Sequence, residues 1–438
     1  MRQEKALIIN YYWPPCGGAG VQRSLKFAHY LPQYGISTRV LTVDEAYAQF
    51  PHYDESMLAE VPEWLEVDKT KARSPYQFYK RFVGKGKVPS AGFANETNPG
   101  LFQKLARFIR GNFFIPDARK GWNSYAIKKA GEIIEQHNIT IIITSSPPHS
   151  TQLIGKELKK IFNLHWIANL ADPWTEIYWY DELHRLPFAR KKDAKLEKEV
   201  IEEADHIITV SHYLKNQFHQ KAPSINPEKI SVIYNGYDEK SFTNIPRTQP
   251  DNEFVITYIG SMADSYKPHV FFDALKKLKA NNSKLALKIT YAGQMSPNIE
   301  NYIFECGLED NLDYRGFVSH DKVLELMMQT NMLLLVIPEF QGDKGNIPGK
   351  LFEYLRAMKP IINIGPKEGE SADLIRETNT GDTFDRSEVD QIVDYIQKRY
   401  TQWSKGYDPI DEMDKSKINL FSREQGAQQL ADIIKNRK

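Results

Sequence analysis

The sequence predicts an α/β protein made of two doubly wound domains, each built on a mostly parallel sheet. Its 438 residues exceed the ~250–300 at which a single core usually divides, so about two domains are expected. Short apolar runs bounded by turn residues alternate with longer helical patterns, which is typical of βαβ units. This rhythm breaks once, in a polar, proline-containing stretch from Asn244 to Asn252, and then restarts. The break indicates a join between two domains near Ile233–Asn252.

The apolar runs expected as strands follow one another along each domain. Those of the first domain are Ala6–Tyr11, Thr38–Val43, Thr140–Thr144, Trp166–Leu170, His206–Val210 and Lys229–Tyr234. Those of the second are Phe254–Ile259, Leu287–Ala292, Met332–Ile337 and Pro360–Ile364. The expected domains are residues 1–240 and 241–420, followed by a last helical pattern within residues 421–438 that no strand follows. We expect this C-terminal helix to return to the first domain.

The composition excludes several classes of protein. Lys and Arg number 57 and Asp and Glu 56, so the formal charge of +1 argues against a nucleic-acid partner. The two cysteines, Cys16 and Cys306, have no histidine at metal-site spacing, so neither a disulfide framework nor a zinc site is expected. No apolar run approaches the ~20 residues that span a bilayer, and the first run is too short for a signal peptide. These features favour a cytoplasmic protein.

The interval from Lys71 to Lys129 differs from the rest of the chain because its 13 Lys and Arg residues face only two acidic residues, a net charge of +11. Apolar residues recur at helical spacing between Leu101 and Ile109, with cations interleaved, which is the pattern of a basic amphipathic helix. One interpretation is a helix that packs on the core and keeps a solvated basic face. The other is docking to an anionic membrane surface or a lipid phosphate, helped by the loops at Gly84–Gly86 and Pro99–Gly100.

A glycine loop follows the first expected strand. Gly17, Gly18 and Gly20 stand just before the helical pattern Ser24–Leu31, where backbone N–H groups can approach a ligand closely. The loop does not match the dinucleotide-binding pattern of glycines. It is interpreted either as a cradle for an anion or a sugar oxygen, or as a purely structural turn.

The strongest local signal in the second domain is the segment Gly345–Pro360. Pro348 suits the first turn of a helix, so a phosphate could be held by free N–H groups before Leu351 and by Lys350. Glu353 lies three residues beyond Lys350, on the same helical face. A cation for phosphate and a carboxylate for ribose hydroxyls are the minimum needed to bind a nucleoside diphosphate. The alternative is an ordinary surface ion pair between the two side chains.

A second glycine turn precedes another lysine in this domain. Gly260 follows the strand Phe254–Ile259, and Lys267 comes seven residues later, within reach of an anionic oxygen. A solvated loop lysine is the alternative.

These segments resemble family 4 glycosyltransferases, which have the GT-B fold of two Rossmann-like domains facing a central cleft. The resemblance covers essentially the whole chain, and its motifs occur in the family's order. They are the glycine loop Gly17–Gly20, ITSSPPHS (Ile143–Ser150), WIANLADPWT (Trp166–Thr175), HIITVS (His206–Ser211), VIYNGYD (Val232–Asp238), YIGS with its lysine (Tyr258–Lys267), YAG (Tyr291–Gly293), RGFVSHDKV (Arg315–Val323) and PGKLFEYLRAMKP (Pro348–Pro360).

The resemblance implies that the second domain binds a sugar nucleotide. Glu353 matches the carboxylate that grips ribose hydroxyls, and Lys267 matches the lysine that neutralises the diphosphate. The backbone of Gly316, Phe317 and Val318 matches the segment beside the base. The turn residues that complete this expected donor site are Gly260, Gly345, Asn346 and Leu351.

The chain departs from the family pattern at two positions. The first acid of the family's carboxylate pair, eight residues before Glu353, is replaced by Gly345, with Glu339 and Asp343 as nearby substitutes. The arginine expected just after the glycine turn is replaced by Ser261 and Met262, so Lys350 would supply the second positive charge.

The resemblance further implies a retaining glycosyltransferase that needs no cofactor, with a nucleotide sugar as co-substrate. The chain contains no Asp-x-Asp, so no metal ion is expected at the donor site. The acceptor, a glycan or a lipid-linked molecule, would enter from the first domain, where His149 and Asp172 follow strands and are candidate catalytic groups beside Lys267 and Lys350. An exposed loop histidine and a turn-capping aspartate are the structural alternatives. The basic interval would bring the enzyme to the inner face of the membrane.

Two other functions remain open at this stage. A nucleotide-sugar epimerase on the same fold would need no acceptor. A non-catalytic sugar-nucleotide-binding protein is the other alternative, suggested by the loss of a carboxylate at Gly345.

Overall fold

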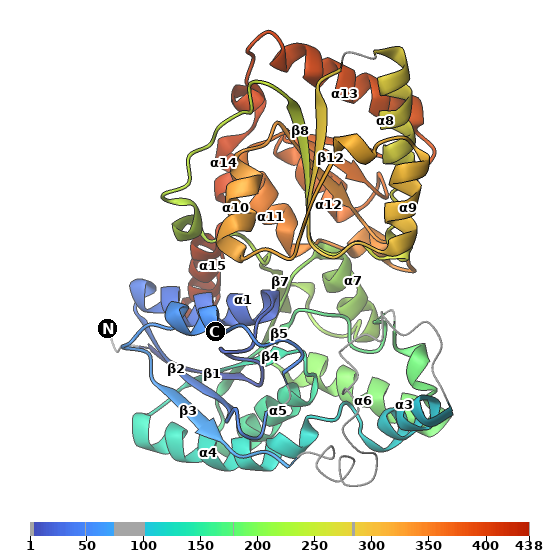
Figure 1. Cartoon of the computed structure of the whole chain (residues 1–438). Coiled ribbons are helices and arrows are strands. Elements are labelled where there is room, and N and C mark those ends of the chain that lie inside the picture. The colour runs from blue at the N-terminus through green and yellow to red at the C-terminus, as the bar shows by residue number, and fades with distance from the viewer. Residues whose placement is uncertain (1–3, 49, 74–100, 178, 283–284, 438) are drawn as a thin grey trace. The chain divides into compact units, whose positions relative to one another are not determined.

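The computed structural model describes residues 4–48, 50–73, 101–177, 179–282 and 285–437. The chain divides into two compact units (Figure 1). Unit 1 comprises Met1–Asn235 together with Gly426–Lys438, and unit 2 comprises Gly236–Gln425. The loops at 84–86 and 99–100 lie outside the described residues.

Unit 1 is built on a seven-stranded sheet in the order β3-β2-β1-β4-β5-β6-β7, with every neighbouring pair parallel. The strands are β1 (Glu4–Asn10), β2 (Ile36–Val43), β3 (Val67–Thr70), β4 (Ile141–Ser146), β5 (His165–Leu170), β6 (His206–Thr209) and β7 (Ile230–Val232). The helices are α1 (Ala19–Tyr30), α3 (Leu101–Phe113), α4 (Asn123–His137), α5 (Ser150–Phe162), α6 (Pro187–Glu203) and α7 (His212–Lys221).

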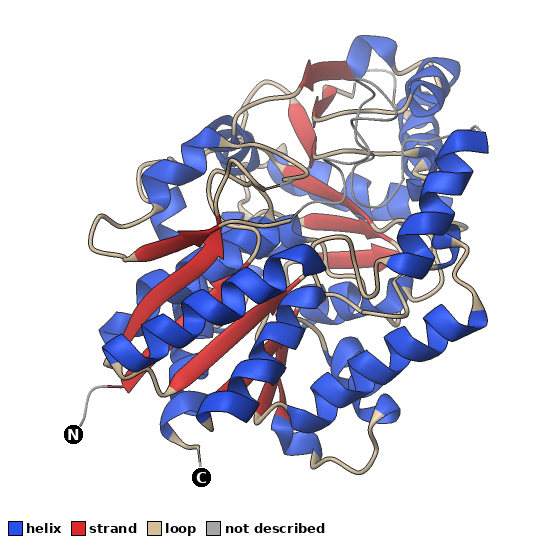
Figure 2. Ribbon diagram, turned by 90° about the horizontal axis from the view of Figure 1, so that it is seen from below, coloured by secondary structure: helices blue, strands red, loops and turns tan. Residues whose placement is uncertain are grey.

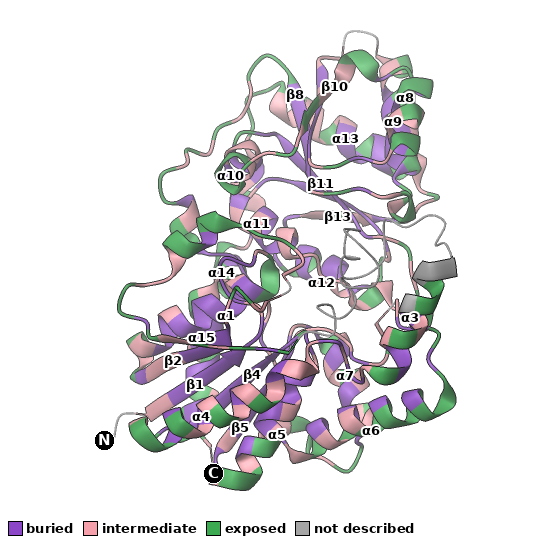
Figure 3. Ribbon diagram, turned by 60° about the horizontal axis from the view of Figure 1, so that its bottom comes forward, coloured by how far each residue is buried: buried purple, intermediate pink, exposed green. Residues whose placement is uncertain are grey.

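Both faces of this sheet are covered, so its central strands read as continuous apolar runs. Along β1, Leu7 and Ile9 join the core under α4, α5 and α6, while Ala6 and Ile8 join the core under α1 and the C-terminal helix α15 (Arg423–Lys435). Four residues of α15 are fully buried in this second core: Ala427, Leu430, Ala431 and Ile434. The buried strands are purple in Figure 3. The last helix of the chain is therefore part of unit 1.

Unit 2 repeats the plan with a six-stranded parallel sheet in the order β10-β9-β8-β11-β12-β13. Its strands are β8 (Phe254–Ile259), β9 (Leu287–Ala292), β10 (Leu312–Gly316), β11 (Met332–Val336), β12 (Ile361–Ile364) and β13 (Gly381–Phe384). Its helices are α8 (His269–Asn281), α9 (Pro297–Glu305), α10 (His320–Met328), α11 (Gly349–Ala357), α12 (Glu370–Glu377), α13 (Val389–Trp403) and α14 (Lys415–Asn419).

The prediction of two doubly wound domains is confirmed, and Figure 2 shows the helices packed around the strands of the sheets. In each sheet the strand order reverses at one point, between β1 and β4 in unit 1 and between β8 and β11 in unit 2. Ligands of such sheets bind beyond the carboxyl ends of the strands at this switch point. The loops after these strands are therefore where each unit is expected to bind its ligand. Among the described residues, no helix combines the length and the apolar character needed to cross a bilayer.

Candidate functional site

Three glycines close the carboxyl ends of β8, β9 and β10 in unit 2. Gly260, Gly293 and Gly316 have φ values of 108°, 143° and 62°, which side-chain-bearing residues rarely adopt. The Gly260 N–H donates to Ala292 O at 2.8 Å, and the Gly293 N–H donates to Gly316 O at 2.7 Å. A Cβ on Gly293 would stand 2.1 Å from Gly260 O. The three turns therefore pack backbone against backbone and form a floor that a ligand can approach closely.

Lys350, in the first turn of α11, reaches this floor. Its Nζ donates to Ile259 O at 2.9 Å, lies 3.9 Å from the centre of the Tyr258 ring, and is 3.5 Å from the position of a Cβ on Gly260. Loss of hydration lowers the pKa of this amine to about 7. The residue as a whole keeps intermediate exposure, so one side of it stays open to solvent. An anion that arrived there would favour the charged amine.

Tyrosines hold the β8 turn in place. Tyr258 and Tyr291 stack with ring centres 5.1 Å apart, and the Tyr291 hydroxyl donates to Gly260 O at 3.2 Å. The hydroxyl of Tyr354, on α11, accepts from Ile259 N at 3.0 Å and donates to Leu334 O at 3.3 Å. Burial raises the pKa of each of these tyrosines, so they remain neutral donors. They fix the start of α11 against β8 and β11.

Glu353 lies one turn beyond Lys350 on α11, with 15% of its side chain exposed. One carboxylate oxygen is 3.0 Å from His320 Nε2, at the first residue of α10. The sequence analysis did not select His320. Its position could have indicated it, because His320 directly follows Ser319, the N-cap of the helix after the β10 loop.

Lys267 follows the β8 turn but is held by a different partner. It forms an ion pair with Glu339, which lies in the loop after β11, and the side chains are 56% and 47% exposed. The ammonium group lowers the pKa of Glu339. A backbone hydrogen bond from Glu339 N to Ser265 O, 2.9 Å long, ties the two loops together. Within the described ranges, no contact joins Lys267 to Lys350 or Glu353.

The remaining residues of the expected donor site have varied surroundings. The Phe317 ring is 96% exposed and Val318 is half-buried. The Gly345 N–H donates to Gly342 O at 3.0 Å, and Asn346 O accepts from the Ser371 hydroxyl at 2.7 Å. The Leu351 N–H donates to Pro348 O at 2.9 Å and its side chain is fully buried, so Leu351 anchors α11. Gly349 and Lys350 are the residues before Leu351 whose first-turn amides no side chain caps.

In unit 1, His149 and Asp172 follow neighbouring strands, β4 and β5. The His149 ring stacks on Trp174 with centres 4.7 Å apart, and its Nδ1 is buried without a hydrogen-bond partner among the described residues. Burial lowers the pKa of His149 to about 4, helped by Arg185 and Lys221 and opposed by Asp117. Burial alone raises the pKa of Asp172 to about 6. The loops after β4 and β5 thus carry a neutral imidazole and a carboxyl group with a raised pKa.

A buried polar network supports these loops from below. The Gln152 amide donates to Ser146 Oγ at 2.9 Å and to Asn169 O at 3.0 Å, and accepts from Thr144 Oγ1 at 2.6 Å. Asn169 donates in turn to Ser145 Oγ at 3.2 Å. Satisfied buried networks of this kind are rigid, so they fix the ends of β4 and β5.

The glycine loop of unit 1 is open. Gly18, with a φ of 117°, caps α1, and a Cβ at Gly18 or Gly20 would meet nothing within 4 Å. Gly17 is more confined, since its N–H donates to His52 O at 3.2 Å and its Cβ would stand 3.1 Å from Asp54 Cβ. The loop is exposed at Gly18 and Gly20, as a cradle requires.

Helix α3 packs with polar residues inward. Arg107 is 8% exposed and pairs with Glu182 at 3.3 Å, while Asn112 accepts from Leu186 N at 2.7 Å. A Cβ on Gly111 would stand 2.4 Å from Leu183 O. The apolar residues of the opposite face are exposed, by 53% at Leu105, 41% at Ile109 and 64% at Phe113. Among the described side chains of α3, the fully buried ones are therefore polar, while three of the exposed ones are apolar.

Comparisons with known proteins agree with this architecture. The family model for glycosyltransferase family 4 matches residues 89–241, and the model for group 1 glycosyl transferases matches residues 241–412. A curated relative, the gpi3 subunit of phosphatidylinositol N-acetylglucosaminyltransferase from Schizosaccharomyces pombe, is 24% identical over 140 residues. That alignment spans 32% of this chain and 30% of the relative.

Two solved structures resemble the whole chain. A glycosyltransferase from Rickettsia africae has a TM-score of 0.63 at 17% identity, covering 99% of this chain and 98% of its own. HepE from Anabaena, solved in complex with UDP, has a TM-score of 0.61 at 14% identity, covering 98% of this chain and 99% of its own. These similarities establish the shared fold. With the two family matches, which adjoin at residue 241, they show that the chain belongs to the family 4 glycosyltransferases of the GT-B fold.

Proposed function

We propose that the protein transfers a sugar from a nucleotide-sugar donor to a glycan or lipid-linked acceptor, with retention of configuration and without a metal ion. Unit 2 binds the donor and unit 1 the acceptor. The observation that carries this proposal is Lys350, a dehydrated amine that lies against the Gly260 turn at the switch point of a parallel sheet. A partly dehydrated cation attracts anionic ligands more strongly than neutral ones.

The donor diphosphate occupies the glycine floor in this proposal. Lys350 and the first-turn amides of α11 bind its oxygens, because an uncapped helix N-terminus and a cation favour the same charge. Glu353 accepts hydrogen bonds from the ribose hydroxyls, and His320 holds the carboxylate in place. The base lies beside the backbone of Gly316–Val318.

Lys267 provides a second positive charge when it leaves Glu339 and binds the diphosphate. In the free protein it pairs with Glu339, and the high exposure of both side chains makes that pair weak. A diphosphate carries more charge than one carboxylate and replaces it. Glu339 and Asp343 then stand in for the acid missing at Gly345.

The reaction breaks the bond between the anomeric carbon and the diphosphate oxygen, and the electron pair stays on the nucleoside diphosphate. The acceptor oxygen bonds to the same face of the anomeric carbon, and its proton passes to the departing phosphate. Lys350, Lys267 and the helix amides stabilise the charge that gathers on the leaving oxygens. Each such donor is worth ~2.7–4 kcal/mol in comparable oxyanion sites.

Asp172 and His149 orient the acceptor hydroxyl. A carboxyl group with a pKa of about 6 accepts a hydrogen bond at neutral pH, and the neutral imidazole can donate one. The indole of Trp174, stacked on His149, adds an aromatic surface of the kind that sugars contact.

The exposed apolar face of α3 docks on an anionic bilayer in this proposal. Leu105, Ile109 and Phe113 follow one another at four-residue intervals, so they form one stripe along the helix. We call Leu105, Ile109 and Phe113 the α3 surface.

A cation borders the α3 surface, since Lys104 precedes Leu105 on α3 and is exposed. Apolar side chains beside a lysine suit a membrane interface that carries anionic lipids. The protein is therefore proposed to act in the cytoplasm, at the inner face of the membrane.

The proposal is tested by incubating the protein with UDP-, GDP- and ADP-sugars and measuring released nucleoside diphosphate, after a thermal-shift screen selects the donor. We expect turnover that Lys350→Met abolishes and that Glu353→Gln lowers about 10–100-fold in folded protein. An isomerised donor formed without any acceptor indicates an epimerase instead. Donor binding without turnover under any acceptor condition indicates a non-catalytic binding protein.

A further inference from the structure

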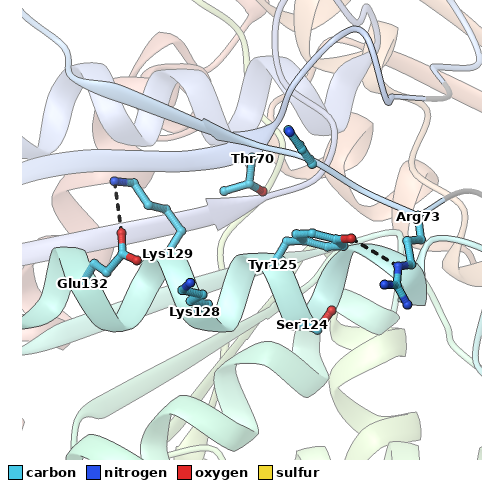
Figure 4. Close-up of a pocket in the computed structure, with 8 residues that line it drawn as sticks. Thr70, Arg73, Ser124, Tyr125, Lys128, Lys129 and Glu132 are labelled. Carbon is cyan, nitrogen blue, oxygen red and sulfur yellow. Dashed lines mark hydrogen bonds and ion pairs between the residues drawn. The ribbon is translucent and has the colours of Figure 1, made fainter.

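A hollow of about 530 Å³ lies at the end of β3 in unit 1, beside α4 (Figure 4). Pockets for small molecules commonly measure ~300–1,000 Å³. We call it the basic pocket, and it is lined by Thr70, Lys71, Arg73, Ser124, Tyr125, Lys128, Lys129 and Glu132.

Four cations and one carboxylate line the basic pocket. Lys129 is paired only loosely, 3.5 Å from Glu132 and 3.7 Å from Asp68. Lys71 and Lys128 are exposed, and the described part of the chain offers neither of them an ion pair. Most of the positive charge in the hollow therefore has no counter-charge among the residues that the structure describes, which favours an anionic ligand.

Hydroxyl groups complete the lining. Thr70 Oγ1 accepts from the Trp122 indole at 2.7 Å, and the Tyr125 hydroxyl accepts from Arg73 Nε at 3.2 Å, as Figure 4 shows for the second pair. Because each hydroxyl already accepts one bond, its own proton is free to be donated to a ligand. The bond to Tyr125 also fixes the Arg73 guanidinium. Cations together with hydroxyl donors match the oxygens of a phosphoryl group.

The basic pocket lies on the edge of the sheet that carries the proposed acceptor groups. Thr70 ends β3, and His149 and Asp172 follow the ends of β4 and β5. The strand order β3-β2-β1-β4-β5 and a spacing of ~4.8 Å put about 14 Å between β3 and β4, and about 19 Å between β3 and β5. One elongated ligand can therefore place a phosphoryl group at β3 and a sugar hydroxyl at β4 and β5.

We propose that the basic pocket binds a phosphate or diphosphate group of the acceptor, at a distance of about 14–19 Å from the hydroxyl that receives the sugar. This rests on the proposed glycosyl transfer and narrows its acceptor to phosphoryl-bearing molecules. The group comes either from a lipid-linked diphosphate or from a water-soluble phosphorylated glycan.

Two hydrogen bonds connect the basic pocket with the α3 surface. Lys120 Nζ donates to Phe113 O at 3.0 Å, and Arg73 N donates to the carbonyl of the next residue, Gly121, at 3.2 Å. The wall of the pocket is thus continuous with the end of α3. This connection makes the lipid-linked source the first to test.

The test uses the full-length protein and calorimetric titration with pyrophosphate and with a short-chain prenyl diphosphate below its micelle concentration. The variant is Lys71→Glu/Lys128→Glu. Its matched control is Lys160→Glu/Lys435→Glu, which changes the charge equally at two exposed lysines in the last turns of α5 and α15. The milder Lys71→Met/Lys128→Met variant covers the case in which charge reversal impairs folding, as judged by thermal melting.

We expect the pocket variants to weaken one class of diphosphate sites at least tenfold, with the control unchanged. A second class, at Lys350, is identified because Lys350→Met removes it and the pocket variants do not. Tighter binding of the prenyl compound identifies a lipid-linked acceptor, and equal binding a water-soluble one. Unchanged titrations overturn the proposal.

The titration measures binding, so it separates this proposal from the proposed transferase activity. Pocket variants that hydrolyse the donor at the wild-type rate, but no longer glycosylate a diphosphate-bearing acceptor, support both. A wild-type protein that binds diphosphate in the basic pocket and turns over no donor refutes the transferase activity alone.

Discussion

The amino group of Lys350 lies 3.9 Å from the centre of the Tyr258 ring. Most buried lysines pair with a carboxylate, whereas Lys350 contacts the face of this aromatic ring. This contact stabilises the ammonium less than an ion pair would, so burial lowers the pKa to about 7. The proposed donor site therefore contains an amine whose charge depends on its ligand.

Nucleoside diphosphate binding should weaken as the pH rises through about 7, because the free protein then loses the Lys350 proton that the complex retains. The sign follows from linkage: above the pKa of the free protein, binding must take up a proton, and Kd rises about tenfold per pH unit. Calorimetry from pH 6 to 9 measures this. In Lys350→Met the slope should vanish, and a slope that persists assigns the titration to another group.

The same lysine affects stability. Its folded-state pKa is about 7, below the ~10.4 of an exposed lysine, so the unfolded chain binds more protons between these values. The contribution of Lys350 is therefore least favourable below pH 7 and improves as the pH rises toward 10. Thermal melting should find Lys350→Met more stable than wild type at pH 6, with a difference that shrinks by pH 9. A difference independent of pH would mean that the amine is not dehydrated.

Replacement of Glu353 by Gln should lower kcat/KM about 10–100-fold, since a charged hydrogen-bond acceptor to the ribose is worth ~1.5–3 kcal/mol. His320→Ala should cost less, because the imidazole only positions the carboxylate, 3.0 Å away. Steady-state kinetics with the selected donor measure both. Equal kinetics for Glu353→Gln and wild type would remove Glu353 from the donor site.

Gly293→Ala should reduce the free energy of unfolding by at least ~1–3 kcal/mol, because φ is 143° and the new Cβ would stand 2.1 Å from Gly260 O. Gly20→Ala is the control, since its Cβ meets nothing within 4 Å. Denaturant unfolding compares the two. The glycine floor is misassigned if both variants are equally stable.

Serine at Leu105, Ile109 and Phe113 should abolish binding to anionic vesicles and leave thermal stability within about 2–4 °C of wild type, because these side chains are exposed. Ile161→Ser, which removes another exposed apolar side chain, is the control. Co-sedimentation with vesicles of phosphatidylglycerol measures binding. Retained binding would place the membrane contact elsewhere.

Much of the fold could be predicted from the sequence, because central strands of parallel sheets are apolar on both faces. The strands β3, β10 and β13 were not predicted. Each lies at the edge of its sheet and is short and polar, as in the VDKT of β3 and the GDTF of β13, so no apolar run marks it.

Lys350 and Glu353 could be selected from the sequence because they lie three residues apart on one helix. A pair of residues that are distant in the sequence leaves no comparable pattern. Lys267 meets Glu339 through loops that follow β8 and β11, and Arg107 meets Glu182, 75 residues away. Periodicity likewise predicted that α3 is amphipathic, but which face is buried depends on those distant partners.

The burial of α15 in unit 1 has a consequence for how the protein is made. Ala427, Leu430, Ala431 and Ile434 follow the whole of unit 2 along the chain, yet they cover a sheet that begins with β1. Unit 2 is an uninterrupted stretch of chain, so it can finish folding during synthesis. Part of one face of the unit 1 sheet stays uncovered until α15 has been made, and a nascent chain stalled before α15 would leave a hydrophobic surface for chaperones to shield.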